Sequence, residues 1–146
     1  TLLEKRTASL LKELNEAFYT EEEKMHLIHE GEASCLALSI MLSEKNIDNI
    51  LAVDERTTRM MVENPLNLAK LLEKKLHQKI WFNNKIGFLN KIMIVRSSEL
   101  IYLAYKKNLL SPNSMQMLDA ALYAAKFKGS AISTEEIKEI KNLAKK

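Results

Sequence analysis

Apolar side chains recur at helical spacing along most of the chain, and this pattern predicts a largely helical protein. Leucine and phenylalanine over residues 2–19 have the spacing of an amphipathic helix. Thr20–Glu23 has the form of a capping box, which predicts the start of another helix. A further helix, with its body over residues 33–42, is apolar on nearly every side. We expect it to be buried on most sides, with Cys35 as a small core residue.

Two runs of apolar residues are too short for helices and predict buried strands. Ile50–Val53 ends at Asp54, and Ile92–Val95 ends at Arg96. Both runs are continuously apolar rather than alternating, which is typical of strands in a parallel sheet. A third short strand is expected over residues 79–82.

Proline and capping motifs predict the boundaries of the later helices. Asn64–Pro65 ends one helix and opens the next, because the residue before proline avoids helical backbone and proline suits a first turn. Ser111–Pro112 predicts the start of a helix that ends at Gly129. Ser133–Glu136 is a second capping box and predicts a last helix.

Strands that alternate with helices favour an α/β fold with a parallel sheet. We therefore expect a predominantly helical α/β domain with a small parallel sheet over residues 1–110, followed by a C-terminal helical extension over residues 111–146. Only 3 Gly occur among the 146 residues, and neither a P-loop nor a dinucleotide-binding glycine motif is present, which excludes both of these enzyme classes. The sequence shows no signal peptide, no apolar run long enough to span a bilayer and a single cysteine, so a cytoplasmic location is expected, with no membrane partner.

The small net charge of +3 hides an uneven distribution of charged residues. Residues 1–69 hold 7 basic and 13 acidic residues, whereas residues 70–107 hold 9 basic and 2 acidic ones. Such a basic middle indicates either a surface for a polyanion or a half that complements the acidic half inside the fold.

Carboxylates lie where the chemistry of a parallel sheet is usually placed, beyond the carboxyl ends of its strands. Asp54 follows the first predicted strand, and Glu32 lies at the start of the apolar helix. Converging carboxylates would hold Mg²⁺ or Mn²⁺, which prefer oxygen ligands. Alternatively, Asp54 caps the helix that follows it and Glu32 is a favourable charge in a first helical turn.

Three segments resemble PIN-domain proteins, and they occur in the order of that family. Glu30–Leu38 resembles the family's Gly-Glu-Ala helix, and Ile50–Arg59 resembles its strand and following turn. Ile94–Leu110 resembles the ending of PIN-like proteins. Together the three segments span over half of the chain.

The resemblance implies a PIN-like three-layer fold and a metal-dependent ribonuclease, a hydrolase that uses Mg²⁺ or Mn²⁺ held by about four acidic residues. By motif, Glu32 is the second acid, Asp54 the third and Glu55 the fourth, and all three are candidate catalytic residues. Proteins of this kind are often toxins of toxin–antitoxin pairs or RNA-processing factors. The implied partners are therefore RNA, an antitoxin-like protein and a second copy of the chain.

One feature departs from the family pattern. The family begins with a central strand that ends in an essential aspartate, and no such strand precedes residue 30. Either this first strand is missing from the chain, or the chain is a degenerate member that binds without cutting. The leading expectation is a metal-dependent endoribonuclease of PIN type. The alternative is a non-catalytic RNA-binding or protein-interaction module on the same scaffold.

Basic residues beside the predicted strand ends are candidates for contact with RNA phosphates. They are Arg56, Arg59 and Arg96, with Ser97 beside the last. The competing interpretation is that these arginines pair with the neighbouring carboxylates. In the basic middle, Trp81–Phe82 either stacks on bases or belongs to the core or to an oligomer contact.

Overall fold

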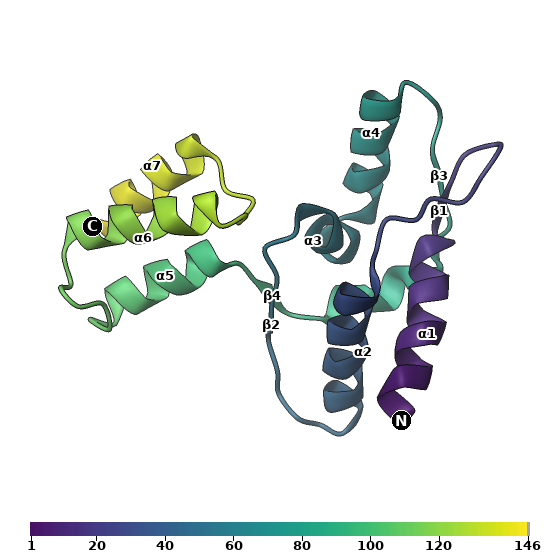
Figure 1. The fold of residues 1–146 in the computed structure, drawn as a ribbon, viewed down its shortest axis with the longest axis horizontal. Helices are drawn as coiled ribbons and strands as arrows, with labels where there is room; N and C mark the ends of the chain where they lie inside the picture. Colours follow the sequence, from purple (N-terminus) through teal and green to yellow (C-terminus); the bar gives the residue numbers. More distant parts are fainter. Residues whose placement is uncertain (146) are drawn as a thin grey trace. The chain divides into compact units, whose positions relative to one another are not determined.

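The computed structural model describes residues 1–145, and this part of the chain is mostly helical with two short pairs of strands (Figure 1). This confirms the predicted mixture of many helices with a small amount of sheet. The helices are α1 (Leu2–Asn15), α2 (Glu30–Glu44), α3 (Arg56–Glu63), α4 (Pro65–Leu76), α5 (Ser97–Lys106), α6 (Met115–Phe127) and α7 (Thr134–Ala144). The strands are β1 (Phe18–Tyr19), β2 (Leu51–Ala52), β3 (Trp81–Phe82) and β4 (Ile94–Val95), and a 3-10 helix, η1, covers Asn84–Lys91.

The chain forms two compact units, and β2 and β4 each cross from one to the other. The first unit comprises residues 1–51 and 56–94, and the second comprises residues 52–55 with the chain from Val95 onward. These divisions differ from the expected boundary after residue 110, because α5 packs with α6 and α7. A PIN-like domain over residues 1–110 stays a prediction. In residues 1–145, no helix combines the length and the apolarity that crossing a bilayer requires.

The core of the first unit holds α1 and α2 side by side (Figure 1). A fully buried leucine or phenylalanine stabilises a fold by about 1.5–3 kcal/mol, so this cluster is the main source of stability. Its largest fully buried side chains are Leu14, Phe18, Leu36, Met61, Leu68, Ile86 and Leu89.

A short antiparallel ribbon of β1 and β3 lies at the edge of this core. Phe18 is opposite Phe82, and Tyr19 is opposite Trp81. Phe18 is fully buried, and its ring stacks on that of Phe82 with centroids 4.9 Å apart. Neighbouring residues of a strand point to opposite faces, so Tyr19 and Trp81 lie on the face away from the core. The sequence predicted β3 but placed β1 inside the first helix, which ends at Asn15 instead.

The helix predicted to start at Thr20 is absent from the described residues, and this prediction was wrong. The Thr20 hydroxyl does accept hydrogen bonds from the N–H groups of Glu22 and Glu23, at 3.3 and 3.1 Å. The Thr20 N–H, however, donates to the Glu23 carbonyl at 2.8 Å, and Lys24 pairs with Tyr19. The motif therefore closes a tight turn, because the bridge between Tyr19 and Lys24 takes the place of a first helical turn.

Helix α2 is covered on one side only. Its buried residues include Ala33, Leu36 and Ala37, whereas Leu38 is 46% exposed and Cys35 is exposed too. The prediction that Cys35 is a core residue was therefore wrong. An apolar composition allows a helix to be buried on every side. How much of the helix is buried depends on how many other elements pack against it.

Strands β2 and β4 pair with each other, and they lie within the two apolar runs that predict buried strands. The Leu51 N–H donates to the Met93 carbonyl at 2.8 Å, and the Val53 N–H donates to the Val95 carbonyl at 3.0 Å. The partners advance together along both strands, which is the hydrogen-bond pattern of a parallel pair. Both strands are shorter than the apolar runs that predicted them.

Helices α5, α6 and α7 form the second unit around a separate apolar cluster that includes Leu118, Leu122 and Ile137. Helix α7 begins at the predicted capping box. Helix α6 begins three residues after Pro112, because the Ser114 hydroxyl accepts from the Met117 N–H at 3.2 Å and supplies the cap.

Candidate functional site

Asp54 joins three parts of the second unit through its carboxylate. The Ser97 N–H donates to Oδ1 at 2.9 Å, and the Ser97 hydroxyl donates to Oδ2 at 2.5 Å. The Ser130 hydroxyl donates to Oδ1 at 2.9 Å. Ser97 is the first residue of α5, so the carboxylate lies at a helix N-terminus, where the helix dipole favours negative charge. Asp54 therefore connects the end of β2 to α5 and to the link before α7.

Arg96, beside this centre, is held by two glutamates of the second unit. Its Nη1 lies 2.7 Å from Glu136 Oε1, and its Nη2 lies 3.2 Å from Glu99 Oε1. Partial burial alone would raise the pKa of Glu136, but the hydrogen bonds from Arg96 and Ser133 outweigh burial and lower it. The same pairings raise the pKa of Arg96 against the opposing effect of its burial. Arg96 thus forms ion pairs within the second unit, as the competing interpretation predicts.

The lowered pKa of Glu136 makes the second unit less stable in acid. A carboxyl group whose pKa falls on folding contributes its stability above its ordinary pKa of 4.5, and loses it as the pH drops through the lower folded value. We expect thermal unfolding at pH values from about 5 downward to show a smaller decline for Glu136→Gln than for the parent chain. Glu135→Gln, a change at the exposed neighbouring residue, is the control and should keep the parent's pH profile.

The acidic residues predicted to hold a metal do not gather into one centre. Glu32 is half-buried in the first turn of α2, and Glu55 is exposed directly before α3. Across residues 1–145, no group of three or more His, Cys, Asp or Glu side chains is placed to hold a metal ion. The oxygens of Asp54 already accept hydrogen bonds from two serines. The described residues therefore show no assembled centre of the kind that the PIN resemblance implies for Mg²⁺ or Mn²⁺, and the metal stays a prediction.

The residues predicted to contact RNA are largely engaged within the protein. Ser97 binds Asp54, and Arg96 is paired as described above. Arg59 is 15% exposed, and its Nε lies 3.6 Å from Glu63. Arg56, at the start of α3, is exposed. Of the four, Arg56 is the residue most accessible to a ligand.

A basic segment of the first unit is exposed, and it lies within the basic middle that the charge distribution indicates. Residues 74–98 contain six Lys or Arg residues and no Asp or Glu. Lys74 and Lys75 lie in the last turn of α4, which ends at the left-handed residue His77 (φ 55°). Lys79 follows and leads into β3, and all three lysines are exposed. We call residues 74–79 the basic segment.

An aromatic pair stands at the end of the basic segment. The rings of Tyr19 and Trp81 are stacked, with centroids 6.2 Å apart and planes at 15°. Lys79 Nζ lies 5.4 Å from the centroid of the Trp81 ring, a cation–π arrangement. Phe82 points to the core instead. Phe82 thus belongs to the core, as one of the two alternatives predicted, and stacking of Trp81 on bases stays a prediction.

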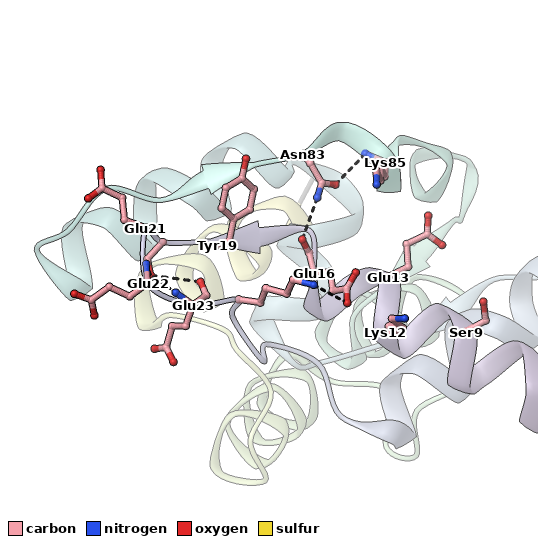
Figure 2. Close-up of a pocket in the computed structure, with 12 residues that line it drawn as sticks. Ser9, Lys12, Glu13, Glu16, Tyr19, Glu21, Glu22, Glu23, Asn83 and Lys85 are labelled. Atoms are coloured by element: carbon pink, nitrogen blue, oxygen red, sulfur yellow. Dashed lines mark hydrogen bonds and ion pairs between the residues drawn. The ribbon is translucent and has the colours of Figure 1, made fainter.

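Tyr19 also lines an open, predominantly acidic cavity of about 850 Å³. Figure 2 shows Glu21, Glu22 and Glu23 at one end of it. Glu16 pairs with Lys24 at 2.8 Å, and this hydrogen bond lowers the pKa of Glu16. Glu21–Glu23 belong to the motif that predicts a capping box, and the turn at Thr20 brings them to a common wall of the cavity instead. The full lining is Ser9, Lys12, Glu13, Glu16, Tyr19, Thr20, Glu21, Glu22, Glu23, Lys24, Asn83 and Lys85.

Comparison of the chain with family models, with curated proteins and with solved structures finds no match.

Proposed function

We propose that this chain is a non-catalytic RNA-binding module on a PIN-like scaffold. The observation that carries the proposal is the acid-free stretch 74–98, with Lys74, Lys75 and Lys79 exposed at its start. No ion pair of these three lysines is seen in residues 1–145, although Glu73 precedes Lys74 and its Oε1 accepts from the Ile80 N–H at 3.1 Å. Unpaired lysines attract a phosphate backbone, and binding releases the counterions condensed on it. The resemblance to PIN-domain proteins supports RNA as the polyanion.

The geometry at Asp54 favours binding over cutting. A carboxylate that accepts three hydrogen bonds from Ser97 and Ser130 stabilises the second unit in its present form. Reassigning its oxygens to a metal would weaken the hydrogen bonds of the partly buried Ser97 and the buried Ser130, and a buried donor left without an acceptor costs about 1–3 kcal/mol. This aspartate is therefore assigned a structural role in our proposal.

We expect RNA binding to depend on the three lysines of the basic segment. The variant Lys74→Gln, Lys75→Gln, Lys79→Gln should bind single-stranded RNA more weakly, because it loses up to three phosphate contacts. Its slope of log affinity against log salt concentration should fall by about two. Fluorescence anisotropy with a labelled oligonucleotide at several salt concentrations measures both quantities.

The control removes the same number of charges from exposed lysines of the second unit: Lys106→Gln, Lys107→Gln, Lys128→Gln. It should keep the affinity and salt slope of the parent chain. Equal losses in the two triple variants would show that net charge alone governs binding. Absence of RNA binding by the parent chain would overturn the proposed function itself.

A metal-dependent endoribonuclease is the second candidate, favoured by the position of Asp54 and Glu55 directly after a strand of a parallel pair. Glu32 gives the sharper test, because no hydrogen bond or ion pair of its side chain is seen in residues 1–145. If the chain cuts RNA with Mn²⁺, Glu32→Gln should abolish cleavage and Glu30→Gln should not. Our proposal expects no cleavage by the parent chain. An antitoxin-like partner and a homodimer stay predictions.

A further inference from the structure

We propose that Trp81 and Tyr19 form a platform on which bases of single-stranded RNA stack, with Lys79 contacting the adjoining phosphate. This inference rests on the proposed RNA binding and names both the surface and the form of RNA that it takes. Stacking on aromatic rings is tolerant of sequence, because every base presents a π face.

The ribbon holds the two rings in a fixed relation. Antiparallel pairing places Tyr19 directly opposite Trp81, and their ring planes differ by only 15°. On the reverse face, Phe18 and Phe82 stack within the core, with Phe18 fully buried. The core pair thus anchors the backbone beneath the outer pair. A surface that is ordered before binding loses little conformational entropy when it binds.

The outer pair keeps its surface open to solvent. Tyr19 is 37% exposed, and Trp81 is partly exposed. The ring interactions seen for these two side chains in residues 1–145 are the stack between them and the cation–π contact of Trp81 with Lys79. A flat base can therefore reach these rings without displacing a core side chain. Where it stacks on the indole, it takes the place of Lys79 Nζ, which lies over that ring.

Charge on the two sides of the platform defines where the phosphates run. Lys74, Lys75 and Lys79 precede Trp81 along the chain, and Lys79 lies over its ring, whereas Glu21–Glu23 line the cavity beside Tyr19. Phosphates are attracted to the lysine side and repelled from the glutamate side. A single RNA strand can place its phosphates along the lysines and its bases on the rings. The bases of a duplex are paired and stacked on each other, so they are not free to stack on a protein ring. The platform therefore selects single strands.

The test uses the fluorescence of Trp81, which is the only tryptophan in the sequence. Oligouridine should quench this fluorescence as it binds, because a stacked base lies against the indole. Inorganic polyphosphate, which has charge but no bases, should bind the lysines without that quenching. A signal of equal size from both ligands, or RNA binding without quenching, would overturn the platform.

Variants at the two rings give a second readout. Trp81→Leu should weaken oligouridine binding roughly tenfold and leave polyphosphate binding unchanged, whereas Trp81→Phe should restore most of the affinity. Tyr19→Leu keeps the fluorophore and should reduce RNA affinity as well. Phe88→Leu, at an aromatic residue 39% exposed on η1, is the matched control and should bind as the parent chain does.

The outcomes separate the platform from the proposed function. If Trp81→Leu and Tyr19→Leu bind RNA as the parent does while the lysine variant binds weakly, the platform is wrong and RNA binding stands. If the parent chain binds no RNA, both fail. Circular dichroism on each variant identifies any loss of fold. If a leucine variant does not fold, the affinity of Trp81→Phe and the fluorescence titration of the parent chain decide whether the platform binds bases.

Discussion

Replacing Asn15 with alanine should lower the free energy of unfolding by about 3 kcal/mol. Asn15 is buried at the end of α1, where its Oδ1 accepts from the N–H groups of Leu27 and Ile28 at 2.8 and 2.9 Å. Its Nδ2 donates to the Ile28 carbonyl at 3.0 Å. One side chain thus satisfies three backbone groups, and alanine would leave them without partners in a largely apolar setting.

Urea unfolding followed by circular dichroism measures this loss. The control is Asn90→Ala, at an exposed asparagine of η1 for which no side-chain hydrogen bond is seen in residues 1–145. It should change stability by less than about 0.5 kcal/mol. A similarly small effect of Asn15→Ala would show that water replaces the amide, and that the segment before α2 is not fixed by α1.

Replacing Asp54 with alanine should destabilise the second unit by about 2–4 kcal/mol, because it removes charge-assisted hydrogen bonds to Ser97 and Ser130. Asp54→Asn should cost less, since its amide oxygen still accepts. Hydrogen exchange at the Ser97 amide, which donates to this carboxylate, reports the loss locally. Asp48→Ala, at an exposed aspartate of the first unit, is the control and should leave that amide protected.

This second prediction also decides how any loss of activity is interpreted. An Asp54 variant that loses RNA cleavage or binding together with amide protection has lost the structure of the second unit. An Asp54→Asn protein that keeps its amide protection and loses cleavage alone would contradict the structural role that we assign to this carboxylate.

Local patterns predicted those parts of the fold that depend on neighbours in sequence. Asn64–Pro65 separates α3 from α4 because both the cap and the proline act within one turn. The capping box at Ser133–Glu136 opens α7 for the same reason. Thr20–Glu23 has an equally good local motif but forms a turn, because pairing of Lys24 with Tyr19 and of β1 with β3 overrides it. Strand β3 is distant from β1 in sequence, and both pairings are antiparallel, so the spacing of apolar residues along the chain does not predict them.

Among the site residues too, those marked by a local pattern could be predicted, and those brought in by distant segments could not. The end of a predicted strand located Asp54, and the strand-end argument also placed Ser97 near the same sheet edge. Ser130 could not be found, because it follows a helix 76 residues later. Which of Trp81 and Phe82 faces outward depends on the register with β1, a strand too short to have a pattern of its own.

The crossing of β2 and β4 between the two units has a consequence for how the protein is made. Residues 52–55 belong to the second unit but are synthesised in the middle of the first. On a ribosome, Asp54 must wait until Ser97 has emerged before its carboxylate finds the N–H that it binds. Neither unit can therefore be released whole by a single cut of the chain, and a fragment ending before β4 would expose the β2 edge to pairing with other chains. Folding of the complete protein is thus a late event of its synthesis.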